Sequence, residues 1–145
     1  MSVTETAAKP APEPKPRPAP IPDAESAPFW AATLEGKLLV QRCSACGHAQ
    51  LYARPHCLVC RSPVVWEQAA GTGTIYSYTV IRQNPSRSFR HLLPFVVALV
   101  DLDEGPRVMT NIVDSPPEAV AIGARVKVTF ELVSEQAAIP NFQLA

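Results

Sequence analysis

The stretch Cys43-Ser-Ala-Cys46-Gly47-His-Ala-Gln-Leu-Tyr-Ala-Arg-Pro-His-Cys57-Leu-Val-Cys60 holds all four cysteines of this 145-residue chain, as two Cys-x-x-Cys pairs with ten residues between them. Each pair can form a turn that presents two thiolates, and two such turns facing each other complete a tetrahedral site for Zn²⁺. Gly47 follows the first pair, where the turn needs a residue that tolerates positive φ. The spacing predicts a small ribbon around one structural zinc ion.

Three other roles for the cysteines compete with zinc binding. Disulfide bonds are disfavoured because the N-terminus lacks the basic start and apolar run of a secretory signal. A dithiol redox centre needs only one Cys-x-x-Cys pair. Iron in a rubredoxin-like site uses the same four ligands, so the spacing leaves iron open. His48 and His56 are surplus to a closed four-cysteine shell and are expected on the surface or behind the ligands.

Upstream of the ribbon, residues 1–22 are rich in proline. Eight of the 16 prolines precede Phe29, and from Lys9 to Pro22 proline alternates with alanine or charged residues. This composition favours an extended polyproline conformation and offers little apolar surface to bury. It predicts that residues 1–22 are a disordered arm or linker, dispensable for folding.

Residues 23–36 change to a helical pattern. Asp23 and Ser26 are candidate caps, and Gly36 is placed to end the helix. The helical period would put Phe29, Trp30 and Leu34 on one face, which would pack on the rest of the domain or bind a partner. Residues 38–42 are then expected to form a short strand that leads into the first cysteine pair.

Beyond Gly71 the pattern becomes β throughout. Strands are predicted at residues 74–81, 95–102, 108–113, 125–132 and 139–144, and the second and third should form a hairpin. The strand at 125–132 alternates cleanly, which places four apolar side chains on one face: Val126, Val128, Phe130 and Leu132. Pro140 lacks an N–H, so the last strand is expected at a barrel edge.

These patterns together predict a mostly β fold. An N-terminal helix and a four-cysteine zinc ribbon over residues 23–70 would be followed by a five-stranded barrel of the oligonucleotide/oligosaccharide-binding (OB) type over residues 71–145. The disordered arm of residues 1–22 would precede both.

The charge composition limits the classes of function. Lysine plus arginine number 13, and so do aspartate plus glutamate, which gives a net charge of +0. A general nucleic-acid binder would normally carry a basic excess. No window approaches the roughly 18 apolar residues that a membrane span requires. A cytoplasmic protein with no membrane association is therefore expected.

Catalytic motifs are missing from the sequence. It contains no GxSxG elbow, phosphate-binding glycine loop, dinucleotide fingerprint or HExxH helix. Binding of all four cysteines to a metal would also remove the usual acyl-carrying nucleophile. His91 is the one candidate near-neutral base in the barrel region, and it lies in an expected mobile loop without visible partners. Catalysis by the chain alone, such as thioester hydrolysis, is not expected.

Two groups of arginines lie in stretches without acidic residues. One comprises Arg82, Arg87 and Arg90, and the other comprises Arg42, Arg54 and Arg61. Guanidinium groups match phosphate and carboxylate geometry, so either group could hold a phosphorylated ligand or an acidic partner. Both could equally be ordinary solubilising charges. The sequence leaves this choice open.

The order of these parts resembles the DUF35 family. The resemblance covers residues 25–145 and is carried by Phe29-Trp30, the run from Gly36 to Cys43, the two cysteine pairs, and three later segments: Gly73-Thr-Ile-Tyr-Ser-Tyr-Thr79, Pro94-Phe-Val-Val-Ala-Leu-Val-Asp101 and Gly105-Pro-Arg-Val-Met-Thr-Asn111. It implies a rubredoxin-like zinc ribbon joined to an OB-fold, with Cys43, Cys46, Cys57 and Cys60 as the zinc ligands.

The resemblance also implies a function. Members of the family are similar to auxiliary subunits of thiolase-superfamily enzymes, including acyltransferases and lipid-transfer-protein-type aldolases that cleave steroid-CoA side chains. Others are fused to, or partnered with, MaoC-type enoyl-CoA hydratases. The chain is then expected to be an essential, non-catalytic subunit in a hetero-oligomer. Its candidate contacts to CoA or to the partner are Phe29, Trp30, Arg54, Arg61, Arg87, Arg90 and His91.

A single-stranded nucleic-acid-binding module is the competing class. Zinc ribbons and OB barrels both recur in such proteins, and Tyr76, Tyr78 and Phe89 could stack on bases. Aromatic residues in strands are more often packed, and the neutral charge is unfavourable to this function.

Overall fold

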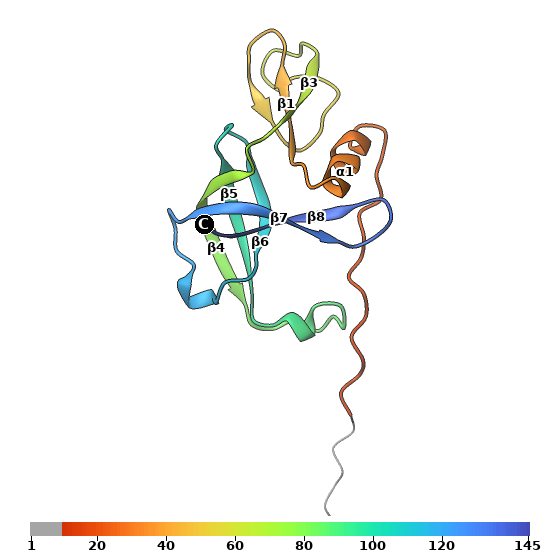
Figure 1. Cartoon of the computed structure of the whole chain (residues 1–145), viewed down its shortest axis with the longest axis vertical. Helices are drawn as coiled ribbons and strands as arrows, with labels where there is room; N and C mark the ends of the chain where they lie inside the picture. Colours follow the sequence, from red (N-terminus) through yellow and green to blue (C-terminus); the bar gives the residue numbers. More distant parts are fainter. Residues whose placement is uncertain (1–9) are drawn as a thin grey trace, which may run out of the picture.

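The computed structural model describes residues 10–145, so part of the predicted arm, residues 1–9, lies outside the described residues. Figure 1 shows the ribbon at one end, helix α1 beside it and the barrel below, with the N-terminal stretch running along the barrel. The elements are α1 (Ala27–Leu34), β1 (Leu39–Cys43), β2 (Ala49–Gln50), β3 (Val64–Gln68), β4 (Thr72–Ile81), β5 (Phe95–Leu102), β6 (Arg107–Ile112), β7 (Arg125–Leu132) and β8 (Ala138–Leu144), with 3₁₀ turns η1 (Arg90–Leu92) and η2 (Pro117–Ala119).

Helix α1 is shorter than the helical pattern of residues 23–36. Before it begins, the Asp23 carboxylate accepts hydrogen bonds from the backbone N–H (2.7 Å) and the hydroxyl (2.7 Å) of Ser26. This turn holds Asp23 outside the helix, and Ser26 is the N-cap residue. Gly36, at φ +71°, follows the helix end as expected. The sequence analysis placed Leu34 on the same packed face as Phe29, and this is wrong: Phe29 is buried, whereas Leu34 is 43% exposed.

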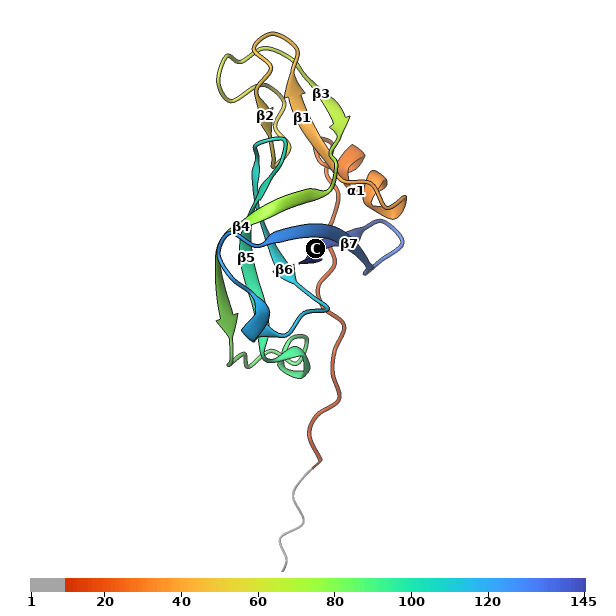
Figure 2. The ribbon, with the colours of Figure 1, turned by 60° about the vertical axis from the view of Figure 1, so that its left-hand side comes forward.

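Three short strands form the ribbon, in the order β2-β1-β3 with antiparallel pairing. The sequence predicts only β1. β2 has only two residues, which are too few to show a periodic pattern. β3 begins with the apolar run Val64-Val65-Trp66, and this run is the only local feature of its sequence that indicates a strand. Figure 2 shows β3 leading directly into β4, so the ribbon continues into the barrel.

The barrel is closed, with strand order β4-β5-β6-β8-β7. Along β5, Val96, Ala98, Val100 and Leu102 are buried and alternate with partly exposed residues, because side chains in a strand point to opposite faces in turn. The five predicted barrel strands and the β5–β6 hairpin are confirmed. On β7 the predicted core face ends early, because Leu132 at the strand end is 73% exposed.

The predicted edge position of β8 is wrong. β8 lies between β6 and β7 and pairs with β7 along its whole length, from Val126–Leu144 to Leu132–Ala138. Its pairing with β6 is restricted to Ile112–Phe142. Pro140 is therefore tolerated inside the barrel, since on the β6 side no strand pairing occurs at its position and its carbonyl accepts a hydrogen bond from the Thr110 hydroxyl (3.1 Å).

Candidate functional site

The two cysteine pairs come together at the tip of the ribbon. The Sγ atoms of Cys43, Cys46, Cys57 and Cys60 all lie within 4.8 Å of one another, and two of the separations are 3.4 Å (Cys43–Cys60) and 3.7 Å (Cys46–Cys57). Four thiolates at about 2.3 Å from a tetrahedral Zn²⁺ would lie about 3.8 Å apart. The arrangement of the predicted ligands therefore fits a four-coordinate structural metal.

The two turns that present the thiols are built alike. In the first, the Gly47 N–H donates to the Cys43 carbonyl (3.1 Å) and the Cys43 N–H donates to the His48 carbonyl (2.8 Å). In the second, the N–H of Arg61 donates to the Cys57 carbonyl (3.0 Å) and the N–H of Cys57 donates to the Ser62 carbonyl (2.9 Å). Arg61 in the second turn is equivalent to Gly47 in the first, and both have a positive φ, which is 64° for Arg61 and 75° for Gly47.

Backbone N–H groups around the cluster favour thiolates. Those of Ala45 and Cys46 point at Cys43 Sγ, and that of Val59 points at Cys57 Sγ, each at 3.4 Å. Hydrogen bonds from Ser62, first through its side chain and then through its backbone, lower the pKa of Cys60 to about 6. Cys46 behaves differently: a backbone hydrogen bond from His48 favours its thiolate, but burial and hydrogen bonds with the other three thiols raise its pKa to about 12. Hydrogen bonding therefore favours the thiolate at Cys60, and a metal ion would have to displace the proton held at Cys46.

Two buried glutamines hold the second cysteine pair against the first, and the sequence analysis did not find them. Gln41 on β1 accepts the Arg54 N–H (2.9 Å) and donates to the Arg54 carbonyl (3.0 Å). Gln50 on β2 donates to Gln41 (3.0 Å) and to the His56 carbonyl (3.1 Å), and it accepts the Leu58 N–H (3.0 Å). Glutamine in a short strand gives no distinctive sequence signal, since it is usually exposed.

The predicted arginine and histidine contacts are not gathered into one site. On the ribbon, Arg54 and Arg61 lie with His56 around one shallow depression beside Cys57. Arg42 lies in a stretch of sequence without acidic residues, but in the folded chain it forms an ion pair with Glu67 at 2.6 Å. His48 and His56 are exposed.

The second arginine group lies on the opposite end of the barrel. Arg87 donates to the Glu13 carbonyl (2.6 Å), and Arg90 donates to the Pro85 carbonyl (2.8 Å). His91 lies exposed in the 3₁₀ turn η1 rather than in an irregular loop. Residues 10–22 lack helix and strand but contact this end, so Arg87 serves in part to hold the chain segment before α1.

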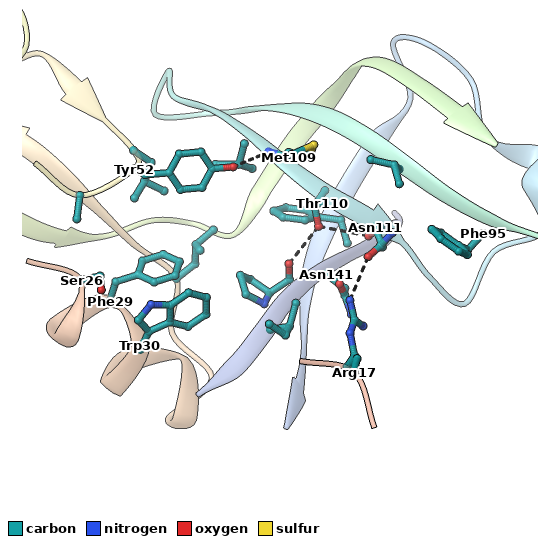
Figure 3. Close-up of a pocket in the computed structure, with 18 of the residues that line it drawn as sticks. Arg17, Ser26, Phe29, Trp30, Tyr52, Phe95, Met109, Thr110, Asn111 and Asn141 are labelled. Carbon is teal, nitrogen blue, oxygen red and sulfur yellow. Dashed lines mark hydrogen bonds between the residues drawn. The ribbon is translucent and has the colours of Figure 1, made fainter. Parts of the chain in front are cut away.

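A largely apolar pocket of about 510 Å³ lies between α1, the ribbon loop at residues 51–53 and the barrel strands β5, β6 and β8. Figure 3 shows Phe29 and Trp30 on α1 facing Tyr52 and the barrel strands across it. The Tyr52 hydroxyl accepts the Met109 N–H at 3.0 Å, which ties the ribbon loop to β6. Phe29 and Trp30 thus line a cavity between the ribbon and the barrel.

A four-cysteine ribbon joined to a closed five-stranded barrel defines a two-part protein that combines a metal-binding ribbon with an OB-fold. Comparison with known proteins agrees: residues 30–65 match the family described as "ChsH2, rubredoxin-like zinc ribbon domain", and residues 66–131 match "ChsH2, C-terminal OB-fold domain". The chain belongs to the DUF35/ChsH2 family.

Three relatives show how far the similarity extends. The chain is 38% identical to a "DUF35 domain-containing scaffold protein" of Methanothermobacter thermautotrophicus over 97 residues, which is 66% of this chain and 72% of that protein. It is 38% identical over 120 residues, 81% of its length, to a Thermomonospora curvata protein named "Probable enoyl-CoA hydratase alpha subunit", but spans only 37% of that protein. In a solved structure named "Ltp2-ChsH2(DUF35) aldolase", one chain superposes with a TM-score of 0.77 at 34% identity, covering 87% of this chain and 98% of that one.

Within residues 10–145, no helix is long and apolar enough to cross a membrane.

Proposed function

We propose that this chain is a non-catalytic subunit that binds and supports a thiolase-superfamily enzyme acting on acyl-CoA thioesters. The partner would be an aldolase, which is a carbon–carbon lyase, or an acyltransferase. The observation that carries the proposal is the structural similarity to a chain of the Ltp2-ChsH2(DUF35) aldolase over almost the full length of that chain. Steroid side-chain degradation is the narrower role that we propose within lipid metabolism, and a cytoplasmic location belongs to the same proposal.

The positions of the thiols and of His91 favour a non-catalytic, auxiliary role for this chain. The four thiols face one another at the ribbon tip, away from the apolar pocket. His91 is exposed at the other end of the molecule. A catalytic site needs a nucleophile or base beside the place where the substrate is held. We therefore propose that the partner supplies the reacting groups.

Zn²⁺ is the metal that we propose for the four cysteines. All four Sγ atoms are within reach of one ion, so a tetrahedral shell would be closed and would have no open position for substrate. Such a site stabilises the ribbon instead of taking part in a reaction.

The ribbon tip is the docking surface that we propose for the partner. Leu58 and Val59, between the second pair of cysteines, are 65% and 67% exposed, and Val65 on β3 is 55% exposed. Arg54 and Arg61 lie beside Leu58. Apolar side chains surrounded by arginines are typical of protein interfaces. Acyl-CoA could meet the same arginines where the subunits join, and a MaoC-type hydratase is a second partner that this surface could accept.

The nucleic-acid alternative is less well supported. Tyr76 and Tyr78 on β4 are exposed, as base stacking would require. However, the Arg107 guanidinium lies 3.3 Å from the centroid of the Tyr76 ring and covers one face of it. Arg107 is itself paired with Asp101 at 2.7 Å, so its charge is already balanced.

Turnover by the complex tests the proposal. The chain would be co-expressed with an Ltp2-type aldolase, and the purified complex compared with each subunit alone on an acyl-CoA substrate of that aldolase. We expect turnover by the complex, little by the aldolase alone and none by this chain. Full activity of the aldolase without this chain, or thioester cleavage by this chain alone, would contradict the proposal.

A further inference from the structure

The four cysteines at the ribbon tip differ in their exposure to solvent. The first cysteine of each turn, Cys43 and Cys57, is buried, whereas the second, Cys46 and Cys60, is exposed. The residues on both sides of Cys46 and of Cys60 are exposed as well. A small reagent in solution therefore has access to the second cysteine of each turn.

Each exposed cysteine contacts a buried cysteine of the other turn. The Sγ atoms of Cys60 and Cys43 are 3.4 Å apart, and those of Cys46 and Cys57 are 3.7 Å apart. A disulfide bond is about 2.05 Å long, so the sulfurs of the closer pair would have to approach by about 1.4 Å. These contacts favour disulfide pairing between the two turns over pairing within one turn.

The charges around Cys60 favour its reaction over that of Cys46. Arg61 follows Cys60 in the chain, and Arg54 lines the same shallow depression as Arg61. In the part of the chain that the structure describes, neither of these arginines forms an ion pair. The arginine nearest to Cys46 in the sequence is Arg42, and an ion pair balances its charge. Reactive cysteines lie in electropositive, partly exposed surroundings, and Cys60 meets both conditions.

We propose that Cys60 is an oxidation site for hydrogen peroxide, and that its oxidation leads to a Cys43–Cys60 disulfide and to loss of the metal. In the first step the Cys60 thiolate attacks one peroxide oxygen, the O–O bond breaks, and hydroxide leaves and takes a proton from the solvent. In the second step the Cys43 thiolate attacks the sulfenic sulfur of Cys60. The S–S bond forms, the S–O bond breaks, and a second hydroxide leaves and is protonated. The two thiolates have then lost the two electrons that the peroxide has gained.

The disulfide would remove two of the four metal ligands. A structural zinc site is closed by four ligands, and the folding of a small ribbon is coupled to its metal. The turn that carries the exposed Leu58 and Val59 should therefore lose its shape when the metal leaves. The free chain would thus be sensitive to oxidation at its ribbon tip. This inference rests on the zinc site proposed above and does not depend on the proposed partner.

Treatment of the full, zinc-loaded chain with hydrogen peroxide tests the inference. Zinc content is measured before the peroxide is added, so that the metal assignment has its own readout. Zinc release is then followed with a chromophoric chelator, and dimedone is added to trap sulfenic acid. Chymotrypsin can cleave after Tyr52, between the two cysteine pairs, and fragmentation mass spectrometry then locates the modification. We expect dimedone on Cys60 and, in its absence, a Cys43–Cys60 disulfide that forms in step with zinc release.

A charge variant and a matched control test the role of the surroundings. Arg61→Gln keeps much of the length of the side chain but removes its charge. It should slow zinc release about two- to fivefold, the effect of one exposed charge contact. Arg90→Gln removes an arginine at the opposite end of the barrel and should release zinc at the rate of the unaltered chain.

Dimedone on Cys46 in place of Cys60, a disulfide within one turn, zinc release without a disulfide, or an unchanged rate for Arg61→Gln would overturn the proposal. A chain purified without zinc would contradict the zinc assignment, and this inference with it. None of these results bears on the partner-binding proposal, because no partner is present in the experiment.

Discussion

Arg61 and Gly47 occupy equivalent positions with positive φ in the two cysteine turns, and only one of them is a glycine. A side chain in the left-handed region costs about 1–2 kcal/mol relative to the right-handed one. The space around a Cβ at Gly47 is open, so a substitution there tests the backbone conformation alone. Arg61→Gly should raise the free energy of unfolding by about 0.5–1 kcal/mol, and Gly47→Ala should lower it by about 1 kcal/mol. Urea unfolding of the metal-loaded chains measures both, and stabilisation by Gly47→Ala would contradict this assignment.

Asp103 joins the turn after β5 to two other strands. Arg125 donates to both of its carboxylate oxygens, at 2.7 and 2.8 Å, and Thr72 donates to one of them. The Arg125 hydrogen bonds, followed by that of Thr72, hold the pKa of Asp103 well below its usual range. In the unfolded chain the pKa of an aspartate is about 3.9. Because the pKa of Asp103 is lower in the folded chain, its ion pair stabilises the fold fully above about pH 3.9, and this stabilisation is lost as the pH falls toward the folded pKa.

Asp103→Asn should therefore lower the melting temperature at pH 7 and have a smaller effect near pH 2, as measured by thermal unfolding across this range. Glu118→Gln, which removes an exposed carboxylate with no ion pair among the described residues, is the control. If Asp103→Asn lowered the melting temperature by the same amount at both pH values, the result would contradict the ion-pair account.

The limits of prediction at this scale follow from the kind of interaction. The ligand role of Cys43, Cys46, Cys57 and Cys60 rests on local spacing, and the structure brings them together. Gln41 and Gln50 bond to backbone groups up to 13 residues away, so nothing near them in the sequence marks their role. The role of seven residues as contacts to a partner or to CoA remains a prediction: Phe29, Trp30, Arg54, Arg61, Arg87, Arg90 and His91.

At the scale of elements, the Gln41–Gln50 pair supports the second cysteine turn. Gln41→Leu keeps the size of the side chain but leaves the Arg54 N–H and carbonyl without their partners. An unsatisfied buried backbone group costs about 1–3 kcal/mol. We expect about one zinc per unaltered chain and a metal affinity at least tenfold lower for Gln41→Leu, measured by competition with a chromophoric chelator.

Cys57→Ser, which removes a ligand, is the positive control for metal loss. Gln68→Leu, on the exposed end of β3, is the matched control and should keep the affinity of the unaltered chain. An unchanged affinity of Gln41→Leu would show that the cysteine turns are positioned without this network.

The contribution of the N-terminal segment, residues 1–22, to the stability of the fold can also be tested. Arg17 forms a 2.7 Å ion pair with Glu131, and Ser88 donates to the Pro16 carbonyl at 2.9 Å. These contacts lie at the surface, where ion pairs contribute about 0–1 kcal/mol. Removing residues 1–22 should therefore lower the melting temperature by no more than about 5 °C. Circular dichroism melting measures this, with Arg17→Ala as the comparison, and loss of the folded barrel would contradict it.

Strands with a clear period could be predicted, and those without one could not. β7 has the predicted bounds because its alternation is unbroken. β2 and β3 form because they pair with β1 across the cysteine loops, which is a non-local effect. The place of β8 inside the barrel depends on strand order, and proline alone gave the wrong expectation. The boundaries 1–22, 23–70 and 71–145 remain our proposal for the domains.

At the scale of the whole molecule, the ribbon and the barrel form one unit with two separate surfaces. The ribbon tip exposes Leu58 and Val59, and the apolar pocket lies on the other side of the ribbon loop, against the barrel. A subunit of this kind can bind a partner through the tip while the pocket stays accessible from the barrel side. The proposed assembly therefore depends on the tip and not on the pocket.

The affinity of the purified chain for an Ltp2-type aldolase, measured by isothermal titration calorimetry, tests the central claim most directly. We predict a stable complex with a dissociation constant at or below about 1 μM, and a loss of at least tenfold for Leu58→Asp, since burying an unpaired charge opposes association. Leu132→Asp, at an exposed position of the barrel, should bind as the unaltered chain does. No detectable binding of the unaltered, metal-loaded chain would contradict the account.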